Sequence, residues 1–225
     1  HPETRPPGMA YNQRYGTRLS MDYPTVAFSA WARDPARRPA VEEAAARLGR
    51  LNGLFTHFHR TQRDIRWSVA GSTSGALVSF PGFARYQDQS DFDVTRLEWF
   101  QAAIHAPSDR PEWGRPFADA DSQTLLMSCA CRLHVATQTV GAVGLEVTLG
   151  TLHRMLLDFS LAVGGRRRNL LVRSIEELRP ETGETVAGYR IVVDTLTLHT
   201  AADWASNAEL PAVEQSDPFL AAFFR

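Results

Sequence analysis

Two pairs of closely spaced residues have the side-chain types of a metal site. His57 and His59 are two positions apart in a segment with helical periodicity. Residues two apart on a helix point to nearly opposite sides, so this pair cannot chelate one ion. Cys129 and Cys131 share one face of a predicted strand, too far apart for an easy disulfide, and fit buried thiols. We therefore predict no metal site.

The motifs of common enzyme active sites are missing from the sequence. It has no glycine-rich phosphate loop, no Gly-x-Ser-x-Gly turn, no His-Glu-x-x-His segment and no Cys-x-x-Cys pair. No nucleophile or general base can be nominated on this basis. We expect no catalysis and no cofactor.

Residues that could bind a small molecule fall on the polar face of two adjacent strands. Odd positions of residues 124–135 are apolar, and the even ones include Ser128 and Arg132. Residues 140–149 alternate in the same way, with Glu146 on the face of small and polar side chains. Such strands pair as an antiparallel hairpin with one face on a core and the other on solvent or a pocket. Two roles stay open for Glu146: contact with a ligand cation, or a cross-strand ion pair with Arg132.

A helix and a second hairpin precede these strands and must position them. Residues 39–63 carry apolar side chains at helical spacing, with a proline in the first turn. Residues 65–69 and 76–80 alternate on either side of a glycine- and serine-rich turn, which predicts a hairpin. A long loop and a short helix over residues 96–104 follow.

The two ends of the chain give weaker signals. Residues 1–24 show no period and are predicted to be an irregular lead-in. Residues 152–163 predict a helix ended by two glycines. Residues 169–174 and 189–200 are strand candidates, with a bulge expected at Thr195.

Composition limits the class of protein. The 225 residues are 44% hydrophobic, enough for a sizeable core. A net charge of −1 gives no global attraction to nucleic acid or to an anionic membrane. No apolar run reaches the roughly 20 residues of a membrane helix. We expect no nucleic-acid partner, and membrane attachment only through segments outside this chain.

The order of elements and short motifs resembles the Cache domains, PAS-like extracytoplasmic sensor modules of bacterial membrane receptors, of the double-Cache type. The segments that carry the resemblance are SGALVSFPG in the first hairpin, RLEWFQAA in the short helix, and GAVGLEVTL in the last strand. The resemblance covers residues 25–163. It implies an α+β fold in which a central antiparallel sheet has a long N-terminal helix on one face and a small-molecule pocket on the other, followed by a smaller C-terminal β-containing segment.

The resemblance also implies a set of ligand-binding residues. In Cache domains that bind amino acids, the short helix supplies an arginine and a tryptophan for the carboxylate, and an aspartate of the last strand binds the ammonium. Here Arg96 is displaced by one position, Phe100 and Phe117 replace tyrosines, and Glu146 replaces the aspartate. These changes disfavour a standard amino acid, because a bidentate arginine contact tolerates little displacement. The predicted site comprises Trp67, Arg96, Trp99, Phe100, Phe117, Ser128, Arg132 and Glu146.

The expected function is ligand sensing, without catalysis, by an extracytoplasmic (periplasmic or cell-surface) domain of a membrane-bound bacterial signalling protein. Residues 25–165 are expected to form the sensor module. Residues 166–225 are either an abbreviated second, membrane-proximal module or an extension of the first. A homodimer through the flanking helices is left open. The alternative function is a ligand-free interaction or dimerisation module on the same scaffold, and an enzyme is the least favoured class.

Overall fold

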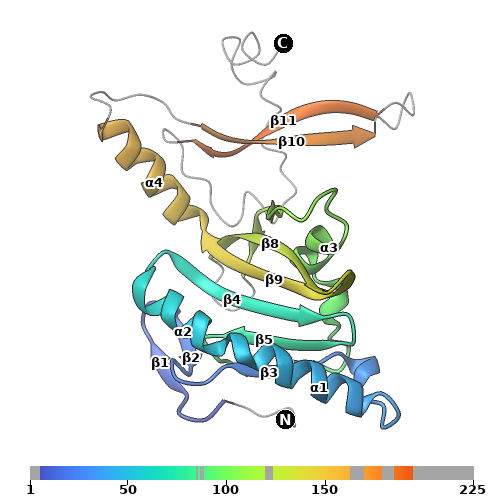
Figure 1. The fold of residues 1–225 in the computed structure, drawn as a ribbon. Coiled ribbons are helices and arrows are strands. Elements are labelled where there is room, and N and C mark those ends of the chain that lie inside the picture. Colours follow the sequence, from blue (N-terminus) through green and yellow to red (C-terminus); the bar gives the residue numbers. More distant parts are fainter. Residues whose placement is uncertain are drawn as a thin grey trace. The chain divides into compact units, whose positions relative to one another are not determined.

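The computed structural model describes residues 6–84, 86, 89–119, 124–162, 170–178 and 185–194. The chain divides into two compact units, and each is treated separately below (Figure 1). The first unit comprises residues 1–115, 120–122 and 126–148, and the second comprises residues 116–119, 123–125 and 149–225.

An antiparallel sheet forms the centre of the first unit. Its strands are hydrogen-bonded in the order β3-β5-β4-β9-β8-β6. They are β3 (Thr25–Phe28), β4 (Ile65–Ser72), β5 (Ala76–Phe80), β6 (Glu112–Trp113), β8 (Leu125–Val135) and β9 (Gln138–Thr148). The two-residue strand β7 (Phe117–Ala118) belongs to the second unit. Both predicted hairpins, β4–β5 and β8–β9, are present, and β4 pairs with β9 to join them. The predicted α+β class with a central antiparallel sheet is confirmed.

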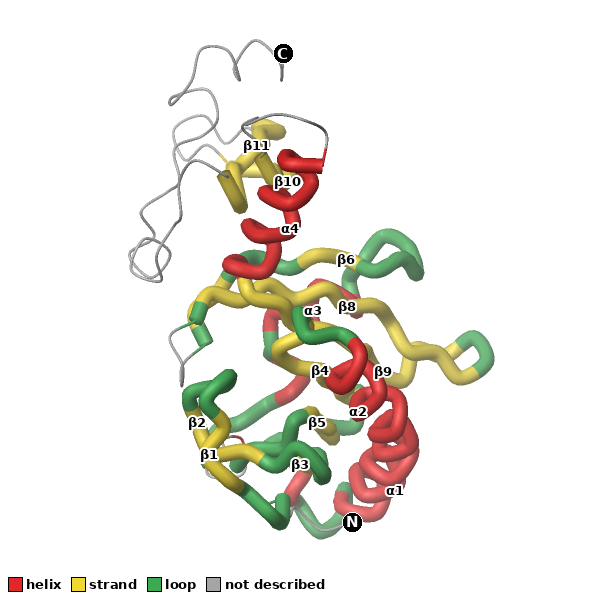
Figure 2. The backbone as a smooth tube through the Cα atoms, turned by 90° about the vertical axis from the view of Figure 1, so that its left-hand side faces the viewer, coloured by secondary structure: helices red, strands yellow, loops and turns green. Residues whose placement is uncertain are grey.

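One face of the sheet is covered by the predicted long helix (Figure 2). It consists of α1 (Arg38–Leu48), a 3-10 turn η2 (Gly49–Leu51) and α2 (Asn52–Thr61). The turn begins at Gly49, a residue type that weakens a helix interior. The side chains that pack between these helices and the sheet are Phe28, Ala32, Val41, Ala45, Leu48, Phe55, Ala70, Ala76, Val78 and Phe80. Each large apolar side chain buried here stabilises the fold by about 1.5–3 kcal/mol.

The predicted irregular lead-in contains regular structure. Strands β1 (Ala10–Asn12) and β2 (Thr17–Leu19) pair as a small hairpin. Its turn residue Tyr15 is only 1% exposed, and Leu19 is 2% exposed. Three-residue strands are too short to show a period in the sequence, which explains why they were not predicted.

A 3-10 helix and a short helix follow the β4–β5 hairpin. The 3-10 helix η4 (Val94–Arg96) leads into α3 (Glu98–Ile104), which begins two residues later than the sequence predicts. The second unit contains α4 (Leu149–Ala162) and a separate antiparallel pair, β10 (Leu170–Leu178) and β11 (Thr185–Asp194). The bulge expected at Thr195 lies outside the described residues, and the register shift of this pair falls between Leu171 and Val172.

A pair of glycine substitutions tests the packing of α3 against the sheet. A Cβ atom on Gly71 would lie 2.7 Å from Val94 Cγ2 and 3.0 Å from Phe100 Cδ2, whereas one on Gly53, in α2, would meet nothing within 4 Å. Gly71→Ala should lower the free energy of unfolding by about 1–3 kcal/mol through overpacking. The control Gly53→Ala should raise it by up to about 1 kcal/mol, because alanine favours the helix. Urea denaturation measures both, and equal effects would contradict the close approach at Gly71.

Candidate functional site

The pleat of the sheet sorts its side chains onto two faces. Ser68 and Ala70 of β4 face α2 and the core, so Trp67, Val69 and Gly71 face the opposite side. Residues paired across neighbouring strands point to the same side, so the register gives three rows of residues on that opposite side. The first row is Trp67, Glu146 and Ser128, and the second is Thr25, Ser79, Val69, Gly144, Ala130 and Glu112. The third row is Ala27, Leu77, Gly71, Ala142 and Arg132. These fourteen residues are called the polar face.

The polar face buries several polar groups among small side chains. Thr25 is 0% exposed, Ser79 1%, Ser128 2% and Glu146 7%. The Ser128 hydroxyl donates to Oε1 of Glu146 at 3.4 Å. A carboxylate held away from water is costly unless hydrogen bonds or charges compensate it. Glu146 is therefore the chemically distinctive group of this face.

An aromatic chain packs against the polar face at Trp67. Phe83 stacks on Trp67 with ring centroids 4.7 Å apart, and Tyr15 lies 5.1 Å from Trp67. Tyr86 contacts Phe83, and Phe92 contacts Tyr86, at centroid distances of 5.6 and 4.8 Å. Aromatic pairs at such distances attract one another beyond their area burial.

Thr25 fixes the position of Phe83 on the polar face. Its hydroxyl donates to the Phe83 carbonyl oxygen at 2.5 Å and accepts from the Phe83 N–H at 2.6 Å. The pair of bonds ties the segment that follows β5 to strand β3. Because Phe83 also stacks on Trp67, this tether helps to orient the indole ring.

Helix α3 covers the Gly71 end of the polar face. Phe100 is 2% exposed and approaches Gly71, and Trp99 packs edge-on against Phe100 at 5.6 Å. The predicted residues Trp67, Phe100, Ser128 and Glu146 are thus gathered on or against one face, with Trp99 beside them. Arg96, by contrast, is exposed at the end of η4. Phe117 is half-buried in β7 and belongs to the second unit.

The alternative role for Glu146, an ion pair with Arg132, is wrong. Register places Arg132 opposite Ala142 and Glu146 opposite Ser128. Arg132 Nη2 instead pairs with Asp109 Oδ1 at 2.9 Å, and His134 Nε2 contacts the same oxygen at 3.0 Å. The hydrogen bond with His134, aided by the Arg132 charge, holds the pKa of Asp109 below its usual value. Arg132 therefore belongs to an ion cluster at the Ala142 end of the polar face.

Sequence reasoning missed five residues of this region. Ser79 could have been found, because the alternation that puts Val78 and Phe80 toward the helices puts Ser79 on the other face. Thr25 lies in a four-residue strand with no clear period. Phe83, Tyr86 and Phe92 lie in a segment without periodicity, so only their ring contacts reveal them.

The helical spacing predicts that His57 and His59 point to nearly opposite sides of α2, and their surroundings differ accordingly. His57 is exposed, while His59 is 4% exposed and bridges two elements. Its Nδ1 lies 3.1 Å from the Tyr15 hydroxyl and its Nε2 lies 3.1 Å from the Ser68 hydroxyl. No group of three or more potential metal-binding side chains occurs among the described residues. His59 thus fits a structural role in the core.

The resemblance to sensor domains implies a central antiparallel sheet with a long helix on one face, which α1 and α2 supply. No family model matches the chain. The chain is 28% identical over 109 residues to the methyl-accepting chemotaxis protein PscA of Pseudomonas syringae pv. tomato. That match covers 48% of this chain and 16% of the relative's length. The predicted resemblance to bacterial sensory proteins is confirmed by this relative.

Solved ligand-binding domains of chemoreceptors are also similar. That of CtaA from Pseudomonas fluorescens with L-leucine is 20% identical, with 84% of this chain and 62% of that chain covered and a TM-score of 0.49. The same domain with L-valine is 21% identical, with 64% and 55% covered and a TM-score of 0.43. That of the amino acid chemoreceptor PctC from Pseudomonas aeruginosa PAO1 with GABA is 18% identical, with 82% and 72% covered and a TM-score of 0.45.

Within the described ranges, none of the helices has the length and apolar character needed to cross a bilayer.

The buried His59 predicts a pH-dependent stability. Burial, followed by the charge of Arg14, lowers the pKa of His59 to about 4. In the unfolded chain the pKa is about 6.5, so the unfolded state binds more protons between these values. The free energy of unfolding should therefore fall by about 3 kcal/mol from this group as the pH drops from about 6.5 to 4.

Urea denaturation at several pH values measures this effect. His59→Gln should flatten the pH dependence of the free energy of unfolding over that range, since glutamine does not titrate. His57→Gln, at an exposed position on the same helix, should leave it as in the parent protein. A flattening by both variants, or by neither, would argue against a neutral buried His59.

Proposed function

We propose that this chain is an extracytoplasmic small-molecule sensing domain of a membrane-bound bacterial signal-transduction protein. It binds its ligand on the polar face and catalyses no reaction. The observation that carries the proposal is the row formed by Trp67, Glu146 and Ser128, in register across β4, β9 and β8. This row places an indole ring, a carboxylate and a hydroxyl side by side on one buried face.

The composition of the polar face supports a binding role over a purely structural one. An apolar side chain at position 146 would be accommodated at less cost than a buried carboxylate. Gly144 and Ala130 lie in the next row, so the sheet beside Glu146 carries little side-chain bulk. Ligand sites combine mostly apolar walls with a few convergent polar groups, which is the mixture found here.

The charge of the polar face favours a ligand with an ammonium group. Glu146 supplies a buried negative group, and Ser128 and Ser79 supply hydroxyls. The predicted carboxylate-binding arginine, Arg96, is exposed, and Arg132 is paired with Asp109. Amines are therefore favoured over organic acids as ligands.

The similarity to a methyl-accepting chemotaxis protein supports a place in bacterial signalling. In the proposed protein, segments outside this chain attach the domain to the membrane. Binding would favour one of two arrangements of the domain, and that shift in population is the signal passed to the output region. A homodimer through the flanking helices stays a prediction that the size of the protein in solution tests.

A thermal-shift screen tests the proposed function. Amines, L-amino acids, organic acids and nucleobases are added separately to the purified chain, since a ligand that binds only the folded state raises the melting temperature. At about 100 times Kd, binding adds about 2.7 kcal/mol, or a shift of roughly 5–10 °C for a chain of this size. The expected result is a shift from amines.

Two charge-removing variants locate the binding. Glu146→Gln should abolish most of the shift given by an active amine, measured against the variant's own ligand-free melting temperature. Glu42→Gln removes a negative charge from α1, on the opposite side of the sheet, and should keep the full shift. If no compound class shifts the parent protein, the proposal fails and a ligand-free interaction module is the better account.

A further inference from the structure

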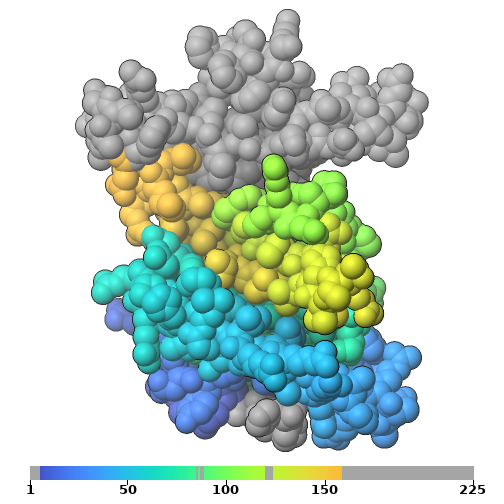
Figure 3. Space-filling model, viewed as in Figure 1, coloured from blue at the N-terminus to red at the C-terminus, as the bar shows by residue number. Residues whose placement is uncertain are grey.

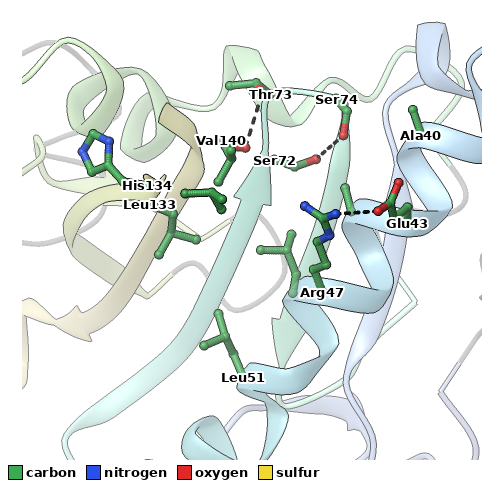
Figure 4. A pocket seen from close by; sticks show the side chains of 13 residues that line it. Ala40, Glu43, Arg47, Leu51, Ser72, Thr73, Ser74, Leu133, His134 and Val140 are labelled. Carbon is green, nitrogen blue, oxygen red and sulfur yellow. Dashed lines mark hydrogen bonds and ion pairs between the residues drawn. The ribbon is translucent and has the colours of Figure 1, made fainter. Parts of the chain in front are cut away.

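A hollow lies on the helix-covered side of the sheet, away from the polar face (Figure 4). It opens between α1 and the tips of the β4–β5 and β8–β9 hairpins and has a volume of about 370 Å³. Its lining consists of Ala40, Glu43, Ala44, Arg47, Leu48, Leu51, Ser72, Thr73, Ser74, Leu133, His134, Val135 and Val140. This hollow is called the α1 groove.

The groove exists because α1 covers only part of the sheet. The helix packs on β4 and β5. Strand β8, which pairs with β9 on the far side from β4, is left with Leu133 half-buried and Val135 53% exposed on the side that faces the groove. Figure 3 shows the side chains of α1 and of the β8–β9 hairpin next to one another on this surface. Apolar carbon therefore lines a concave surface that the described part of the chain does not fill.

The polar side chains of the groove already have hydrogen-bonding or ionic partners. Glu43 and Arg47 pair at 2.5 Å on the surface of α1. The Ser72 and Ser74 hydroxyls are 2.9 Å apart, and the Thr73 hydroxyl donates to the Val140 carbonyl oxygen at 3.3 Å. His134 contacts Asp109. A charged ligand would have to compete with these contacts and give up hydration, so the lining favours an uncharged one.

The size of the groove limits what it can hold. Small-molecule pockets occupy about 300–1,000 Å³, and a cavity of about 150 Å³ already accepts benzene. Ala40 and Ala44 leave space on the helix side, where leucines would fill it. We infer that the α1 groove is a second binding site, for an uncharged small molecule with an aromatic or branched apolar body of about the size of indole. This site does not depend on the function proposed for the polar face.

Titration of the whole chain with indole tests the inference. Binding is followed by two-dimensional amide NMR and by calorimetry. The expected result is saturable binding that shifts the amide signals of residues 72–74 and 133–140. Ala44→Leu places three carbons more into the groove and should weaken binding at least about tenfold. Ala46→Leu, the same change at an exposed position of α1 outside the lining, should change binding less than about twofold.

Three outcomes would overturn the inference. One is no saturable binding of indole up to its solubility limit. Another is equal weakening by Ala44→Leu and Ala46→Leu, which would place binding elsewhere. The third is a dimer, seen by sedimentation, that Ala44→Leu dissociates and indole does not affect, since the groove would then be a contact between copies. Glu146→Gln should leave indole binding unchanged, which separates this result from the test of the polar face.

Discussion

Strand β4 is buried along its whole length, and its register with the neighbouring strands decides which side chains lie on each face of the sheet. All eight residues from Ile65 to Ser72 are buried. The strand pairs with β5 on one side and β9 on the other, so it aligns the two hairpins. A slip by one residue would turn Ala70 away from the helices and Trp67 into the core. Near the end of β4, Gly141 of the neighbouring strand β9 has no room for a Cβ atom, which would lie 2.0 Å from the Gly71 carbonyl oxygen.

The same strand holds the N-terminal hairpin in place. The Arg66 guanidinium donates to the carbonyl oxygens of Arg14 and Tyr15, and lies 4.4 Å from the centre of the Tyr15 ring. On the next residues of β4, Trp67 contacts the Tyr15 ring and Ser68 contacts His59, which reaches the Tyr15 hydroxyl. Charge-assisted hydrogen bonds and a cation–π contact thus attach the β1–β2 hairpin to β4, although this short hairpin has little surface area of its own to bury. Tyr15 thus links a segment with no sequence periodicity to strand β4 and helix α2.

Alternation in the sequence predicted the sheet well because side-chain direction in a strand depends only on position. It located both hairpins and the face of β8 and β9 that carries Ser128 and Glu146. Register could not be predicted in the same way. The β8–β9 turn contains Ala136 with φ of 53°, a conformation that glycine or asparagine usually signals. Several turn lengths are therefore compatible with the sequence, and only the pairing of β8 with β9 fixes the neighbours of Arg132.

The independence of the two sheet faces has an evolutionary consequence. Ala130 and Gly144 are neighbours on the polar face, whereas Cys129 and Leu145 are neighbours on the opposite face. Exchange of Ala130 changes the space above the sheet without changing a side chain that packs toward α1 and α2. A gene family built on this scaffold can therefore diversify what its members recognise while the helix-covered core stays under separate selection for stability.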